Sequence, residues 1–136
     1  MRKFFAAAAA AIFAVATLAG TADAQTRPTG VWRNPANSLH VRIQPCGRDM
    51  CGTVVWASER AQQRARERGT PNLVGAQLFR QLRPASGGSW SGQMFVPNLQ
   101  RTVSGTLRVR SPNAVEASGC AMGGLVCRSQ TWTRIS

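Results

Sequence analysis

The two ends of the predicted domain carry the feature that most constrains the fold of this chain. The stretch from Cys127 to Arg134 reads Cys-Arg-Ser-Gln-Thr-Trp-Thr-Arg and alternates like a β-strand with one large aromatic residue. Its natural partner near the other end is Gly30-Val31-Trp32. A last strand that pairs with a first strand closes an antiparallel sheet and removes its unpaired edges. The sequence therefore predicts a barrel in which the two ends meet.

The beginning of the chain is typical of a secretory signal peptide, residues 1–24. Met1-Arg2-Lys3 supplies positive charge, an apolar run follows from Phe4 to Leu18, and Ala22-Asp23-Ala24 is a small-x-small cleavage site. The apolar run is short for a membrane-spanning helix, so we expect cleavage and no transmembrane segment afterwards. The remaining residues, 25–136, suit one monomeric β-barrel domain that is periplasmic or secreted.

The exported part is strongly basic. Removing Arg2, Lys3 and Asp23 lowers the formal net charge from +12 to +11 and leaves fifteen arginines and no lysine. Such a surface attracts anions, and an exported protein meets anionic envelope lipid or polysaccharide first. The arginines are scattered, without the basic stripe and aromatic platforms of nucleic-acid binders. We therefore expect no nucleic-acid partner. We attribute the excess of arginine mainly to the overall amino-acid composition of the chain and not to a binding site.

From residue 30 onward, short period-two runs are separated by Gly, Pro and Asn, which is typical of an all-β domain. We expect about eight strands in nearest-neighbour order, forming an antiparallel up-and-down barrel. The stretch 73–82 is ambiguous, because its apolar residues would also suit a helical turn. Pro45 is expected to end its strand. The other expected strands lie within 39–44, 52–58, 90–96, 102–110 and 115–120.

Residues 59–68 interrupt the β pattern with Ala, Gln, Glu and Arg, which favour helix. Ser58 suits the N-cap of this helix and Gly69 its end. The helix offers only alanines to a partner, so we expect one short helical excursion into solvent.

The four cysteines are spaced for two hairpins. Cys46 and Cys51 flank four residues, and Cys120 and Cys127 flank six that include Gly123-Gly124. The Cα atoms of opposed residues in an antiparallel pair are about 4.5–5.5 Å apart, which is within disulfide range. Four cysteines allow three pairings, and these spacings favour the two local ones in an oxidising compartment. They are not the tight spacings of zinc sites, so we expect no metal.

Several short motifs carry a family resemblance. They are Gly30-Val31-Trp32, Ile43-Gln44-Pro45-Cys46, Cys51-Gly52-Thr53-Val54-Val55-Trp56, Trp90-Ser91-Gly92 and Ser129-Gln130-Thr131-Trp132-Thr133-Arg134. Together they resemble the bacterial envelope family called domain of unknown function 2147, over essentially all of residues 30–134. The resemblance implies a small barrel similar in topology to lipocalins, and it brings no established activity.

Two stretches depart from the family pattern. Phe95-Val96-Pro97 stands where the family usually has Tyr-Asp-Pro, and Gln100-Arg101-Thr102-Val103 stands in place of a Gly-Lys-Thr-Tyr run. Because Val96 replaces the carboxylate, no role that depends on that carboxylate carries over to this chain.

The resemblance also implies how one barrel end closes. Lipocalin-like barrels place a late Arg over the indole of an early Gly-x-Trp, and Trp32 with Arg134 matches this arrangement as a cation–π contact worth about 0.5–2 kcal/mol. Trp56, Gln130 and Trp132 are candidates to line a ligand cavity, since aromatic residues supply rigid apolar walls. An eight-stranded barrel can instead be filled by its own side chains, and we rank that alternative slightly ahead.

The sequence contains few residues in patterns that are typical of catalytic sites. The chain has one histidine, His40, on the polar face of a predicted strand, and no Gly-x-Ser-x-Gly motif. We therefore expect no enzyme, no catalytic residue and no cofactor.

Two functional hypotheses follow. The first is a non-catalytic barrel that binds a small apolar or amphipathic ligand in the periplasm. The second is a structural or interaction protein of the envelope, with a filled barrel and an arginine-rich surface that contacts anionic lipid, lipopolysaccharide or an acidic partner. A cavity of about 300 Å³ or more would favour the first.

Overall fold

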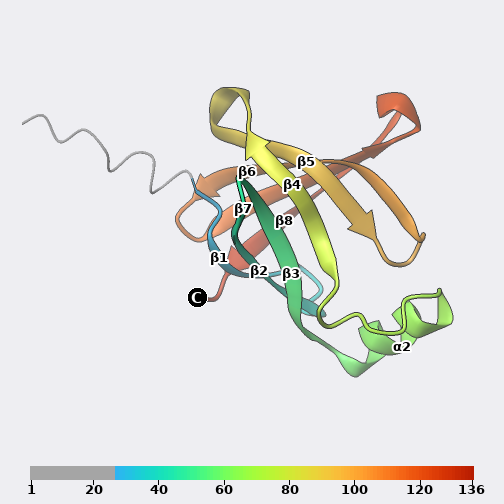
Figure 1. The fold of residues 1–136 in the computed structure, drawn as a ribbon. Helices are drawn as coiled ribbons and strands as arrows, with labels where there is room; N and C mark the ends of the chain where they lie inside the picture. Colours follow the sequence, from blue (N-terminus) through green and yellow to red (C-terminus); the bar gives the residue numbers. More distant parts are fainter. Residues whose placement is uncertain (1–26) are drawn as a thin grey trace, which may run out of the picture.

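The computed structural model describes residues 27–136, so the predicted signal peptide lies outside the described residues. Eight strands pair antiparallel in sequence order and close when β1 meets β8 (Figure 1). The predicted up-and-down barrel is therefore confirmed. The elements are β1 (Gly30–Arg33), β2 (Leu39–Cys46), β3 (Asp49–Ala57), α2 (Glu59–Glu67), β4 (Gln77–Pro84), η1 (Ser86–Gly88), β5 (Ser89–Val96), β6 (Arg101–Ser111), β7 (Ala114–Ala121), η2 (Met122–Gly124) and β8 (Val126–Arg134).

The two ends of the described chain meet as the sequence predicts. In the β1–β8 pair, Trp32 lies opposite Arg134 and Arg33 lies opposite Thr133. The Trp32 side chain is fully buried, and the guanidinium carbon of Arg134 lies 4.3 Å from the centre of its ring system. This contact closes one end of the barrel.

Because successive strands reverse direction, their connections alternate between the two barrel ends. The β1–β2, β3–β4, β5–β6 and β7–β8 connections lie at one end, which we call the mouth. The remaining connections and the C-terminus lie at the other, the closed end, and Figure 1 shows α2 and the C-terminus on different sides of the barrel. Large side chains fill the closed end: Trp32, Val41, Ile43, Leu82, Leu107 and Val115.

A bulge in β3 changes which side chains face inward. His40 of β2 pairs with Trp56 and Val41 pairs with Val54, which leaves Val55 without a partner. One extra residue in a strand moves every following side chain to the other face. Ala57 is consequently buried, and Trp56 lies on the outside, 42% exposed.

A second bulge explains the ambiguous stretch 73–82. Only its second half is a strand, β4, and Phe79 and Leu82 both point into the core although they are three residues apart. Gln81 between them adopts a left-handed conformation with φ 52°. On β5, a Cβ added to Gly92 would lie 2.5 Å from the Arg80 carbonyl oxygen. Gly92 therefore allows the bulged β4 to approach β5 closely. The helix-like spacing of apolar residues in 73–82 results from this bulge in a strand.

Pro45 does not end β2 as predicted. The strand continues to Cys46, and Pro45 pairs with Met50 of β3. The last β2 residue that pairs with β1 is Ile43, so Pro45 has a neighbouring strand on one side only. At such a position the missing N–H removes no ladder hydrogen bond, which makes proline tolerable.

Both predicted disulfides are present, and none of the four cysteines is free. Cys120 and Cys127 lie directly opposite each other in the β7–β8 register. The β2–β3 hairpin differs in detail from the expectation. Cys46 pairs with Asp49, so the bridge to Cys51 is diagonal, with a Cα–Cα distance of 5.8 Å.

The predicted helix is α2. The Ser58 hydroxyl accepts a hydrogen bond from the Ala61 amide at 3.1 Å, and the helix ends before its C-cap, Arg68. It is not a purely solvated excursion, because Ala65 is 1% exposed and belongs to the core. Within residues 27–136, no helix is long and apolar enough to cross a membrane.

Candidate functional site

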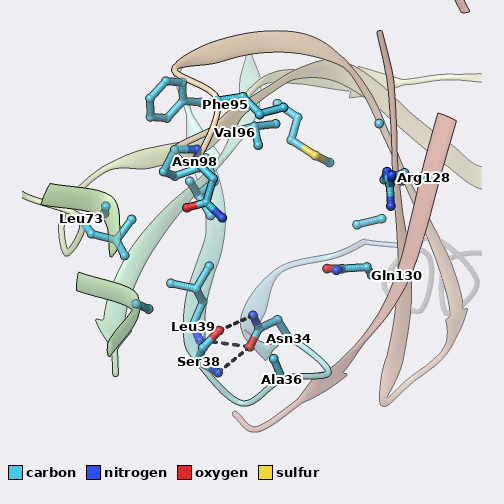
Figure 2. Close-up of a pocket in the computed structure, with 18 of the residues that line it drawn as sticks. Asn34, Ala36, Ser38, Leu39, Leu73, Phe95, Val96, Asn98, Arg128 and Gln130 are labelled. Atoms are coloured by element: carbon cyan, nitrogen blue, oxygen red, sulfur yellow. Dashed lines mark hydrogen bonds between the residues drawn. The ribbon is translucent and has the colours of Figure 1, made fainter. Parts of the chain in front are cut away.

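The barrel has a cavity of about 790 Å³ that is open to solvent at its mouth (Figure 2). Its walls come from the inner faces of β4 to β8, and its rim comes from α2 and the β1–β2 and β5–β6 connections. The filled interior that we ranked ahead is therefore wrong. A cavity of this size lies within the range of about 300–1,000 Å³ that small-molecule sites occupy.

Small inward residues lie beside the cavity on β6 and β7. Along β7 the inward positions run from Val115, which is buried at the closed end, to Ala117 and then Gly119. On β6 the inward position next to Leu107 on the mouth side is Gly105. Met94 of β5 packs over both glycines, because a Cβ added to Gly105 would lie 3.0 Å from its Cβ and one added to Gly119 would lie 3.3 Å from its sulfur. Ala117 and Gly119 line the part of the space that remains open.

The floor of the cavity is apolar and aromatic. Leu78, Phe79 and Trp132 line it and are all at least nine-tenths buried. The Phe79 and Trp132 rings meet edge to face, with centroids 5.8 Å apart. Trp132 Nε1 is buried and has no hydrogen-bond partner within the described residues. The floor thus offers apolar contact and a single unsatisfied donor.

One row of β8 side chains runs from the floor to the mouth. Trp132, Gln130 and Arg128 alternate along the strand and all line the cavity. In Figure 2, Arg128 and Gln130 lie across the cavity from Leu73 and Phe95. Both polar side chains are exposed, so solvent reaches them through the mouth. The structure thus places two of the three residues predicted to line a cavity, Gln130 and Trp132, on its wall.

Trp56 is the exception. The bulge at Val55 turns its indole to the outer surface, where it lies 4.4 Å from the His40 ring, centroid to centroid. It does not line the cavity.

Sequence reasoning missed the contribution of α2. Arg60 and Arg64 line the cavity at the rim, beside Ala61 and Ala65. Residues four apart lie on one helix face, so a signal was present in the spacing of the two arginines. The composition of the helix alone does not show that this face lies against the barrel mouth.

Side-chain hydrogen bonds hold the rim in place. Asn34 Oδ1 accepts from the amides of Ser38 and Leu39 at 2.8 and 3.0 Å, which fixes the β1–β2 connection (Figure 2). The Gln100 side chain donates to the hydroxyl of Thr70, joining the β5–β6 turn to the segment after α2. The mouth is therefore built from mutually supported loops.

The charged groups on the cavity wall are all positive. Arg60, Arg64 and Arg128 line it, and no aspartate or glutamate does. Within residues 27–136 the ion pairs are Arg83–Asp49 at 3.0 Å and Arg110–Glu116 at 2.9 Å, and neither pair lines the cavity. No group of three His, Cys, Asp or Glu residues in this range is placed to hold a metal ion.

A closed, eight-stranded antiparallel barrel with a Trp–Arg plug at one end and a cavity at the other is a lipocalin-like barrel. The structure is similar to that of protein HP1028 from the human pathogen Helicobacter pylori, which belongs to the lipocalin family. The TM-score is 0.62 at 12% sequence identity, over 81% of this chain and 84% of that chain. This likeness concerns the fold.

The family itself follows from the sequence. The family model described as "uncharacterized protein conserved in bacteria (DUF2147)" matches residues 30–134, so the chain belongs to the DUF2147 family. A search of curated proteins found no match.

Proposed function

We propose that this protein binds a small apolar or amphipathic ligand in its barrel cavity and does not transform it chemically. The cavity carries this proposal: it measures about 790 Å³, it opens at the mouth, and its floor is formed by Leu78, Phe79 and Trp132. Burial of apolar ligand surface against such a floor supplies about 25 cal/mol per Å² before the costs of association are subtracted. The alternative hypothesis, a purely structural protein, required a filled barrel, and the cavity is inconsistent with that requirement.

The residues that line the cavity also support the proposal that the ligand is not transformed chemically. The residues that line the cavity include no histidine, cysteine, aspartate or glutamate. Its two serines already serve the fold, because Ser58 caps α2 and the Ser38 hydroxyl accepts a hydrogen bond from Asn34 at 2.8 Å. A general base within reach of a nucleophile, which hydrolytic triads require, has no candidate here.

We place the protein, as a monomer, in the periplasm or outside the cell. The two disulfides support this location, because such bridges persist in oxidising compartments. The signal-peptide pattern of residues 1–24 supports it independently.

Titration with N-phenylnaphthylamine, a neutral fluorophore that brightens in apolar surroundings, tests the binding proposal. Ala117→Phe places a large ring in the cavity and is expected to weaken binding at least about tenfold, equivalent to about 1.4 kcal/mol. Thr131→Phe is the matched control, since Thr131 is exposed on the outer face of β8. Circular dichroism should show that both variants are folded. Equal affinities of the two variants, or no saturable binding by the wild type, would refute the proposal.

A further inference from the structure

We infer that the ligand is an anionic amphiphile, with its acidic headgroup at the mouth and its apolar tail towards the floor. This inference rests on the proposed function and adds the class of ligand and its orientation. It is carried by the sign and the placement of the charges on the cavity wall.

The charge on the wall has a single sign and is not neutralised from within the protein. Arg60, Arg64 and Arg128 line the cavity, and within residues 27–136 none of their three side chains forms a hydrogen bond or an ion pair. Glu59 and Glu67, the two acids of α2, do not line it. An anion at the mouth therefore meets guanidinium groups that have no competing partner.

The arginines stand on facing sides of the mouth. Arg60 and Arg64 lie on α2, which joins β3 to β4, and Arg128 lies on β8 beside the β7–β8 hairpin. In a closed barrel of eight strands these two connections are four strands apart, which is the largest separation around the barrel. The positive charge thus flanks the opening, and such an arrangement concentrates anions within it.

The depth of the cavity fixes the orientation of an amphiphile. At the floor, the unsatisfied polar group is one neutral donor, Trp132 Nε1, among Leu78, Phe79 and other apolar side chains. A single N–H cannot offset the desolvation of a carboxylate or phosphate, which is costly without paired charges. At the mouth, Arg128 remains exposed, so a headgroup there keeps part of its hydration. The tail then occupies the floor.

Carboxylates and phosphates share the chemistry that this mouth recognises. The planar guanidinium group donates two parallel hydrogen bonds to either anion. Gln130, one step deeper on β8, adds a neutral polar side chain between the headgroup zone and the floor. The shared class is a single-chain lipid with a terminal oxyanion, and direct comparison of the two headgroups distinguishes them.

The experiment measures binding of four dodecyl compounds by calorimetry at low ionic strength, below their micelle concentrations. They are dodecanoate, dodecyl phosphate, dodecanol and dodecyltrimethylammonium. Charge-assisted hydrogen bonds contribute about 1.5–3 kcal/mol, so at least one anion should bind about tenfold or more tighter than dodecanol. The cation should bind most weakly. The tighter anion identifies the headgroup.

Charge-neutralising variants locate the headgroup. Arg60→Gln/Arg64→Gln and Arg128→Gln should each lower the affinity for the preferred anion about five- to tenfold and leave dodecanol unchanged. The control for the helix is Arg66→Gln/Arg68→Gln, which removes the same charge from positions that do not line the cavity. Arg108→Gln, on the outer face of β6, is the control for the strand.

The outcomes separate the two levels of the proposal. If no dodecyl compound binds, the proposed function fails. If all four bind equally, or if the control variants lose as much anion affinity as the rim variants, the cavity is a site without charge selection and this inference fails alone. If Trp132→Phe abolishes the anion preference while Arg128→Gln preserves it, the headgroup lies at the floor and the orientation is overturned.

Discussion

At the scale of single residues, the closed end of the barrel depends on one stacked pair. The Arg134 guanidinium lies over the buried Trp32 ring and also donates to the carbonyl oxygens of Thr29 and Pro112, both at 2.6 Å. Gly30 has φ 139°, and a side chain there would collide with Arg134. The glycine of the Gly-x-Trp motif therefore makes room for the arginine, a steric reason for a pattern that the sequence shows only as spacing.

We predict that Trp32 and Arg134 are energetically coupled. Trp32→Ala should lower the free energy of unfolding by about 3–5 kcal/mol, because a buried aromatic leaves a cavity. Arg134→Ala should lower it by about 1–3 kcal/mol through lost stacking and hydrogen bonds. In urea unfolding, the sum of the two losses should exceed the loss in the double variant by at least about 0.5 kcal/mol. Strict additivity would contradict a direct contact.

Single residues also mark where prediction from sequence fails. Alternation along β3 would place Trp56 on the same face as Val54, and the unpaired Val55 reverses that expectation. Gln81 has the same effect in β4. Neither residue type favours a bulge, so the bulges arise from pairing with neighbouring strands, which a local pattern does not contain.

At the scale of elements, α2 matters because it forms part of the cavity rim. Ser58 caps its first turn, and the Thr70 amide donates to the Ala65 carbonyl oxygen at 2.7 Å just after its end. These contacts hold a short helix that would be marginal in isolation.

We predict that Ser58→Ala lowers the free energy of unfolding by about 1 kcal/mol, the usual cost of losing an N-cap. Because the helix lines the cavity, the variant should also bind N-phenylnaphthylamine more weakly. Ser91→Ala, at an exposed position on β5, is the control and should alter neither quantity. A loss of stability with unchanged affinity would show that the rim does not depend on the cap.

The two disulfides each stabilise a hairpin, at opposite ends of the barrel. For such short loops, the chain-entropy model gives about 2–2.5 kcal/mol per bridge, so reduction should lower stability in urea without abolishing the fold. Peptide mapping should recover Cys46–Cys51 and Cys120–Cys127. A reactive thiol in denatured, unreduced protein would contradict this pairing.

At the scale of the whole molecule, most positive charge faces solvent without an acidic partner. Two of the arginines in residues 27–136 form ion pairs. We predict that the protein binds heparin and anionic vesicles at low salt and releases them by about 0.15 M salt, where screening acts within about 8 Å. Retention at high salt would indicate a shaped anion site on the outer surface instead of scattered charge.

The architecture could be predicted from the sequence, whereas the cavity could not. Strand alternation, the cysteine spacings and the Gly-x-Trp motif are local patterns, and each specifies its element directly. The cavity depends on the small β7 residues Ala117 and Gly119 on its inner wall, and on α2 at its rim. The volume left open inside the barrel depends on which side chains meet across several strands. That depends on the strand register, which no single stretch of sequence specifies.

The closed end has a practical consequence for the study of this protein. The C-terminus is joined there to the first strand, since the Val31 amide donates to the Ser136 carbonyl oxygen and the Ile135 amide donates to the Val31 carbonyl oxygen, both at 2.9 Å. Residue 27 precedes the same strand. Both ends of the described chain therefore lie at the closed end of the barrel, opposite the mouth. Coupling it to a sensor surface through its C-terminus should leave the rim facing the solution, so that captured compounds enter as they would in the free protein.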